Sequence, residues 1–283
     1  IWRKKRLRLP LGRILWNLMI KAHARANRPL AAESWVVDML DRIYQPDRIS
    51  YNTLLHAFAR RGNYLKITEW MRRMRARGVK PDAWSYAAAA NAYANADILE
   101  GAEDVVNDMI ERQYGRESAV PWNAVLKICA RRGMDAVAES WYNRMIDNKC
   151  QPDKVTFLLL IKSCGSDAES AGRWLEEMQQ QGLSPGREHF HSVMTAHARN
   201  ADVGGVEAWM RVMADQGLGP QVYSFNIMLS ACAQAGDTQA AEGVAELMRE
   251  EGLRLDVFSY SALIGTYAEA AEPEGALRWL YDA

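Results

Sequence analysis

The chain has 283 residues, of which 49% are hydrophobic and 25% are charged, a composition typical of a folded globular protein. Lys plus Arg and Asp plus Glu number 35 each, and this balance excludes a uniformly basic or uniformly acidic protein. No apolar run reaches the length of about 18 residues that a membrane span needs, so we expect no transmembrane segment.

The charges are divided unevenly along the chain. Residues 1–82 hold 19 Lys or Arg against 6 Asp or Glu, whereas residues 83–283 hold 16 against 29. We treat residues 1–12, with the basic run WRKKRLR, as the end of a preceding element, and we expect the sequence to be a piece of a longer protein. The positive surplus favours an anionic partner near this end, although a solvated charged face would give the same pattern.

From residue 13 onward, amphipathic stretches come in pairs. In residues 48–82 the first stretch, SYNTLLHAFARR, ends before Gly62, and the second, YLKITEWMRRMRAR, ends at Gly78. Glycine supplies the left-handed conformation that follows many helix ends. Pro29 and Pro273 lie near the start of second stretches, where a missing N–H costs least. Because no stretch alternates as a strand would, we expect an all-α fold of helix pairs.

The pairs recur with a period of about 35 residues, and one methionine marks each complete unit. These are Met39, Met74, Met109, Met145, Met178, Met213 and Met248. Five of these methionines follow a tryptophan four residues earlier: Trp35, Trp70, Trp141, Trp174 and Trp209. Trp279 extends this column into the partial unit. Residues at this spacing share a helix face, so we expect a packing seam between units. Cys129, Cys164 and Cys232 also share one repeat position, which indicates packing residues rather than metal ligands or disulfides.

This pattern predicts an α-solenoid of about eight helix–turn–helix units. The units are 13–47, 48–82, 83–118, 119–153, 154–186, 187–221, 222–256 and the partial unit 257–283. The fifth unit is two residues short near CGSDAESAG, and we place that deletion in the turn between its helices.

Two units carry a resemblance to a known family. RISYNTLLHAFARRGNYLKITEWMRRMRARGVKPD (48–82) and VYSFNIMLSACAQAGDTQAAEGVAELMREEGLRLD (222–256) resemble the 35-residue pentatricopeptide repeat of the P type. The Trp-Leu-Gly-Tyr pattern of tetratricopeptide repeats is absent. The resemblance implies a right-handed α-solenoid superhelix that binds single-stranded RNA, one base per repeat.

The resemblance also implies that the fifth and last residues of a repeat contact one base, and that Asn with Asp prefers uracil over cytosine. The matching pairs are Asn17 with Asp47, Asn52 with Asp82, Asn123 with Asp153, and Asn226 with Asp256. We assign no base to the remaining complete units, which carry Ala87 with Ser118, Leu158 with Gly186, and His191 with Gln221. The predicted target is 5′-UUnUnnU-3′, with C tolerated in place of U.

Two further columns follow from the resemblance. Apolar second residues of adjacent repeats should clamp each base, a role that fits Ile14, Ile49, Val120 and Val155. Larger side chains that could stack on bases stand in the same column at Trp84, Tyr223 and Phe258, whereas Glu188 is unsuited to it. Arginines near the end of the first helix should lie near phosphates, although the helix dipole alone would favour them: Arg25, Arg60, Arg131 and Arg199.

The sequence gives no sign of catalytic chemistry. The zinc deaminase motifs H-x-E and P-C-x-x-C do not occur, and neither does a Gly-rich phosphate loop. His189 and His191 lack further ligands nearby, so we expect no metal, no cofactor and no enzymatic activity. The resemblance implies action in RNA processing, stabilisation, editing or translation in a plastid or mitochondrion, with other RNA-processing proteins as further partners. A protein-binding scaffold with a degenerate RNA code and the targeting region of a larger enzyme remain alternatives.

Overall fold

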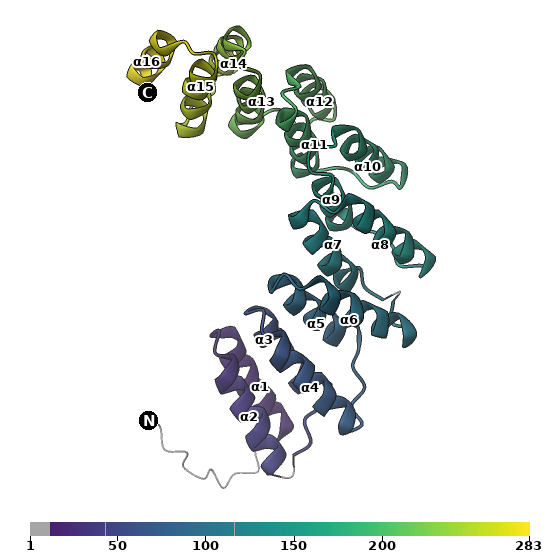
Figure 1. Cartoon of the computed structure of the whole chain (residues 1–283). Helices are drawn as coiled ribbons and strands as arrows, with labels where there is room; N and C mark the ends of the chain where they lie inside the picture. Colours follow the sequence, from purple (N-terminus) through teal and green to yellow (C-terminus); the bar gives the residue numbers. More distant parts are fainter. Residues whose placement is uncertain (1–11, 43, 116) are drawn as a thin grey trace. The chain divides into compact units, whose positions relative to one another are not determined.

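The computed structural model describes residues 12–42, 44–115 and 117–283, which form sixteen α-helices with no strand among them (Figure 1). The first helices of the eight pairs are α1 (Arg13–Arg25), α3 (Arg48–Ala59), α5 (Ala83–Asn95), α7 (Val120–Arg132), α9 (Lys154–Ser163), α11 (Arg187–Arg199), α13 (Val222–Ala235) and α15 (Val257–Glu269). The second helices are α2 (Pro29–Asp41), α4 (Tyr64–Ala76), α6 (Leu99–Glu111), α8 (Asp135–Asp147), α10 (Ala168–Gln180), α12 (Val203–Asp215), α14 (Thr238–Glu250) and α16 (Pro273–Asp282). The predicted all-α class is therefore confirmed. The basic segment lies, up to residue 11, outside the described residues.

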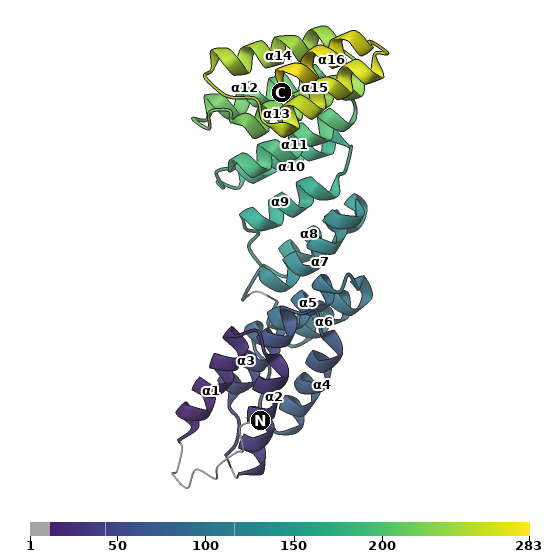
Figure 2. The same ribbon diagram turned by 90° about the vertical axis from the view of Figure 1, so that its left-hand side faces the viewer.

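The chain divides into two compact units. The first comprises residues 1–128 and 141–151, and the second comprises residues 129–140 and 152–283. In the first unit α3 packs against α1 and α5, and α4 packs against both α3 and α5. In the second unit α13 packs against α11 and α15, with α12 and α14 beside it (Figure 2). Within each unit, therefore, the odd-numbered helices form one layer and the even-numbered helices another.

The turns and helix starts follow from local sequence. Gly62, between α3 and α4, has a φ of 61°, and a Cβ there would lie 3.4 Å from the backbone nitrogen of Ala96. Glycine avoids the strain that other residues have in this left-handed conformation. Pro29 and Pro273 are the first residues of α2 and α16, as expected from the missing N–H of proline.

The short fifth repeat differs from its expected form. Helix α9 has 10 residues, whereas α3 has 12, and each is followed by a four-residue turn, 164–167 and 60–63 respectively. Placing the deletion in the turn was therefore wrong, because the two residues are missing from the end of the helix. The turn holds Gly165 at a φ of 64° and supplies Asp167 as the N-cap of α10.

The predicted packing seam between neighbouring repeats is confirmed. All seven recurring methionines are fully buried, with 0% of each residue exposed. Burying a side chain of this size contributes about 1.5–3 kcal/mol. In the first unit the buried Trp70 and Trp141 each donate from Nε1 to a glutamate Oε1 at 2.9 Å, Glu33 and Glu103 respectively. The tryptophan column is less uniform than the methionine column, because Trp35, Trp174 and Trp209 are only half-buried.

The cysteines are packing residues, as predicted. Cys129, Cys164 and Cys232 are buried, and burial raises the pKa of the Cys164 and Cys232 thiols to about 11. Among the described residues, no group of three or more His, Cys, Asp or Glu side chains could hold a metal ion. No helix in the described part of the chain combines the length and apolar character of a membrane span.

Candidate nucleic-acid interface

A capping box joins the end of one repeat to the first helix of the next. The Asp82 carboxylate accepts the backbone N–H of Ser85 at 3.0 Å, and the Ser85 hydroxyl accepts the N–H of Asp82 at 3.2 Å. Two of the donors left open at the start of α5 are thereby satisfied. The other Asp boxes are Asp47 with Ser50, Asp153 with Thr156, and Asp256 with Ser259. The last residue of these repeats is therefore the N-cap of the next first helix.

The predicted base-reading asparagines extend three of these boxes. Asn52 Nδ2 donates to Asp82 Oδ1 at 3.0 Å, and the Ser85 hydroxyl donates to Asn52 Oδ1 at 2.6 Å. We call this arrangement the Asn–Asp–Ser triad. The corresponding two distances are 3.2 and 2.5 Å for Asn17, Asp47 and Ser50, and 3.1 and 2.7 Å for Asn226, Asp256 and Ser259. Sequence reasoning missed the serines, although the spacing Asp-x-x-Ser is a visible capping signal.

The triad fixes which way each amide points. A carboxylate can only accept hydrogen bonds, so the amide nitrogen of Asn52 must face Asp82 and its oxygen must face Ser85. Each amide has two N–H groups and two oxygen lone pairs, so one donor and one acceptor remain for a ligand. Asn17, Asn52 and Asn226 are half-buried, which leaves their amides accessible.

Electrostatics keep two of the triad carboxylates ionised. Burial raises the pKa of Asp47, but hydrogen bonds within its triad and the Arg13 guanidinium, 3.8 Å away, outweigh burial and lower that pKa. The pKa of Asp256 is lowered in the same way, because the hydrogen bonds of its triad outweigh burial. Both side chains are therefore acceptors for the asparagine amide at neutral pH.

The fourth predicted pair spans the two units. Asn123 belongs to the first unit and is buried, with 8% of the residue exposed. Asp153 belongs to the second unit, where its carboxylate caps α9. The joint contribution of Asn123 and Asp153 to base recognition stays a prediction.

The fifth and sixth repeats lack a readable pair and have different contacts at the corresponding positions. In the sixth repeat His191 Nε2 lies 2.9 Å from Ser224 Oγ, where an asparagine oxygen lies in the triads. Burial, with a smaller effect from Arg187, lowers the pKa of His191. His189 is fully buried and links the N–H of Gly186 to a backbone carbonyl of α9. These two histidines are therefore structural contacts of this repeat, and they do not converge on a common ligand.

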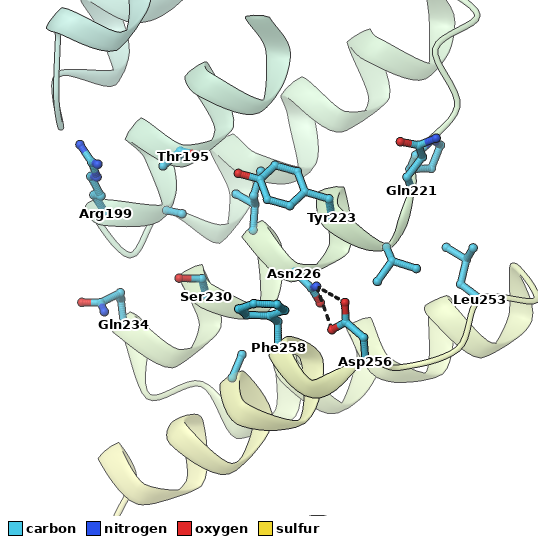
Figure 3. A pocket seen from close by; sticks show the side chains of 15 residues that line it. Thr195, Arg199, Gln221, Tyr223, Asn226, Ser230, Gln234, Leu253, Asp256 and Phe258 are labelled. Carbon is cyan, nitrogen blue, oxygen red and sulfur yellow. Dashed lines mark hydrogen bonds between the residues drawn. The ribbon is translucent and has the colours of Figure 1, made fainter. Parts of the chain in front are cut away.

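The side chains predicted to clamp the bases are exposed. The exposed fraction is 75% for Ile14 and 64% for Ile49, and Val120 and Val155 are also exposed. In the second unit Tyr223 and Phe258 line a cavity of about 1040 Å³ (Figure 3). Figure 3 shows Asn226 between these two rings and its hydrogen-bonded partner Asp256 beside Phe258. The cavity thus combines two aromatic faces with one oriented amide.

Basic residues occupy the same layer. The four predicted arginines are all exposed: Arg25, Arg60, Arg131 and Arg199. In the second unit a cavity of about 570 Å³ is lined by Arg131, Arg132, Lys162 and Arg199, and also by the carboxylate-bearing Glu188. Sequence reasoning missed Lys162, although lysine stands at the same repeat position in Lys21 and Lys127.

The helix pairs, the buried seam and the capped repeat junctions define a tandem helical-repeat protein. Family profiles agree: the PPR repeat family profile matches residues 12–60, 46–95 and 117–166, and the pentatricopeptide repeat domain profile matches residues 210–270. The chain belongs to the pentatricopeptide repeat family.

Curated relatives match a short part of their own length. Two pentatricopeptide repeat-containing proteins of Arabidopsis thaliana are 29% identical over 90 residues and 27% identical over 93 residues. Each match covers 31% of this chain, but only 11% and 15% of the respective relative. A third Arabidopsis relative, named as chloroplastic, is 21% identical over 90 residues, which are 31% of this chain and 10% of the relative.

Solved structures share the fold. PPR10 from maize matches 93% of this chain and 38% of its own, with a TM-score of 0.73 and 22% identity. The match to PPR10 in complex with an 18-nt psaJ RNA element covers 96% of this chain and 40% of the PPR10 chain, with a TM-score of 0.82 and 21% identity. The match to the PPR domain of Arabidopsis thaliana protein-only RNase P 1, in complex with tRNA, covers 65% of this chain and 98% of that domain's chain, with a TM-score of 0.56 and 15% identity.

Proposed function

We propose that this chain binds single-stranded RNA and reads one base with each repeat that carries an Asn and Asp pair. The observation that carries this proposal is the Asn–Asp–Ser triad, which leaves one donor and one acceptor of an oriented amide beside exposed apolar side chains. Membership of the pentatricopeptide repeat family and similarity to an RNA-bound PPR10 support it. The proposed target is 5′-UUnUnnU-3′, read by Asn17, Asn52, Asn123 and Asn226.

The free amide groups match the edge of uracil. The open lone pair on Asn52 can accept from the uracil N3–H, and the open N–H can donate to a uracil carbonyl. Cytosine has no N3–H, so it satisfies only part of this arrangement and should bind less tightly. The side chains of Ile49 and Trp84, both exposed, would contact the two faces of that base.

Phosphate contacts would supply much of the affinity. We assign this role to Arg25, Arg60, Arg131 and Arg199, and their four contacts predict a slope of log K against log salt of about −3. In the cell, a bound strand would be shielded from nucleases or kept unfolded. We place this activity in organellar RNA processing, stabilisation, editing or translation, in a plastid or mitochondrion.

A second candidate function is a protein-binding scaffold that has lost part of its RNA code. The acidic balance of residues 83–283 and the unreadable pairs of three complete repeats favour it. Salt dependence separates the two functions, because a scaffold would bind poly-U weakly and with a flat slope. We infer that the segment itself is not catalytic, and a role as the targeting region of a larger enzyme is compatible with either function.

A single substitution tests the assigned register. We expect Asn52→Thr, with Asp82 retained, to shift the preference at the second base from U to G, while preferences at the other positions stay as they are. Fluorescence anisotropy with four RNAs that differ only at that base measures the shift. An unchanged preference for U at the second base would mean that Asn52 does not read it.

A further inference from the structure

We propose that Ser50, Ser85 and Ser259 are positioning residues that set which bases the asparagines accept. This inference rests on the proposed RNA-binding function and adds a third residue to each reading pair. None of these serines need touch RNA, because each acts through the amide of the asparagine from the preceding repeat.

Counting the hydrogen bonds of Ser85 shows why its proton goes to Asn52. Its oxygen accepts the backbone N–H of Asp82 at 3.2 Å. Its single proton can go to Asn52 Oδ1 at 2.6 Å or to Asp82 Oδ1 at 3.1 Å, and the shorter distance favours Asn52. Because Ser85 is fully buried, water does not compete for this proton. The hydroxyl is therefore a dedicated donor to the amide oxygen.

This donor decides the order of donor and acceptor that the base meets. With its oxygen held by Ser85 and its nitrogen held by Asp82, Asn52 offers a base one lone pair and one N–H in a fixed order. The N3 atom of uracil is a donor, whereas the N3 atom of cytosine is an acceptor, so a flipped amide would favour cytosine. Asp82 sets which end of the amide faces the carboxylate, and Ser85 adds a second restraint at the oxygen end, so loss of Ser85 should weaken the preference for uracil.

Ser85 is the third residue of its repeat, and other repeats of this chain carry other residues or other contacts at this third position. Thr156 is fully buried there and accepts the N–H of Asp153 at 3.1 Å, so threonine fits without loss of the capping box. Ser224 lies 2.9 Å from the Nε2 atom of His191, the residue at the fifth position of the sixth repeat. The hydroxyl at this position therefore contacts side chains of different chemistry at the fifth position of the preceding repeat.

Ser85→Thr and Ser85→Val form a matched pair, because valine has the shape of threonine but a methyl group in place of the hydroxyl. Binding is measured to 5′-UUGUGGU-3′ and to the same RNA with C at the second base. The threonine variant should keep the wild-type ratio of the two affinities. In the valine variant the ratio of the affinity for U to the affinity for C at the second base should fall by roughly 3- to 10-fold, the effect of one neutral hydrogen bond. The corresponding ratio at the first base should be the same as in the wild-type protein.

A second readout does not need RNA. In the free protein, the side-chain amide signals of Asn52 should shift in the valine variant and stay in place in the threonine variant. Ser85→Ala repeats the test if thermal melting shows that the valine variant does not fold. Unchanged amide signals together with an unchanged U-to-C ratio in the valine or alanine variant would overturn the serine proposal alone. Failure of the wild-type protein to bind either RNA would instead overturn the proposed function, and with it any role of Ser85 in base choice.

Discussion

The two units of the chain carry their candidate recognition residues in different ways. In the first unit, the triads of Asn17 and Asn52 stand in consecutive repeats, within residues 1–82, where Lys and Arg exceed Asp and Glu by 13. In the second unit, Asn226 and Asp256 line a cavity together with Tyr223 and Phe258, whereas the two repeats before that of Asn226 carry Leu158 and His191 at the corresponding position. We infer that charge contributes more to binding in the first unit and that stacking contributes more in the second.

This difference is possible because the helix pairs form both in repeats that carry an Asn and Asp pair and in repeats that lack one. The seam methionines are fully buried in repeats with and without a readable pair. The first helix of the sixth repeat begins correctly although Gly186 replaces aspartate, because the buried His189 accepts the N–H of Gly186 at 3.1 Å. A repeat can therefore carry other residues in place of the Asn and Asp pair and keep its fold.

The largest expected effect comes from the aromatic cavity of the second unit. Replacing both Tyr223 and Phe258 by alanine should weaken binding to 5′-UUGUGGU-3′ by about 1–3 kcal/mol per stacked base, measured by fluorescence anisotropy. The matched change in the first unit, Ile14→Ala with Ile49→Ala, should cost less because aliphatic side chains have no π-face. Equal losses in the two double variants would contradict the contrast between the units.

Two N-cap aspartates of the seventh repeat separate folding from recognition. Asp256 caps α15 within a triad, and Asp237 caps α14 in the other layer. Each change to alanine should lower the free energy of unfolding by about 1 kcal/mol, measured by denaturant titration. We expect only Asp256→Ala to lose the preference for U at the seventh base. A similar loss in Asp237→Ala would show that the effect comes from stability rather than from the triad.

Salt dependence tests the phosphate contacts that we assign to the arginine column in both units. Arg60→Gln in the first unit and Arg199→Gln in the second should each make the slope of log K against log salt shallower by about 0.7. Arg211→Gln is the control, because Arg211 lies on α12 and forms an ion pair with Glu207. If the control changes the slope as much as the other two variants, the arginine column has no special place in binding.

The smallest expected effect is a pH dependence of stability. The pKa of Asp256 is lower in the folded chain than its usual value of 3.8, so this carboxylate stabilises the fold above that pH and ceases to do so as the pH falls through the folded pKa. The difference in melting temperature between the wild-type protein and Asp256→Ala should therefore shrink below pH 3.8. A difference that stays constant from pH 7 to pH 3 would mean that the charge of Asp256 does not contribute.

Most of the fold could be predicted because the repeat makes each signal appear several times. The period of Met39, Met74 and the later methionines identified the helix pairs and their buried faces, and both are confirmed. The shortening of α9 was misplaced, because sequence spacing shows that two residues are missing without showing which element lost them. Only the observed bounds of α9 and α10 show that the first helix of the repeat is the shortened element.

The candidate site was less completely predictable. The resemblance to the family identified the asparagine and aspartate positions, and in three repeats the structure brings them within hydrogen-bonding distance. The role of Ser85 between Asn52 and Asp82 depends on a contact between two repeats, and a sequence pattern read one repeat at a time does not show it. The burial of Asn123, likewise, depends on packing that its repeat position does not reveal.

The most direct test is a selection from a pool of RNAs with seven randomised consecutive nucleotides, followed by sequencing of the bound fraction. Our account predicts enrichment of U at the first, second, fourth and seventh positions, C as the next most frequent base there, and no preference at the other three. Bound RNA with no enriched base, or with U enriched in a different spacing, would contradict the claim that Asn17, Asn52, Asn123 and Asn226 each read one base.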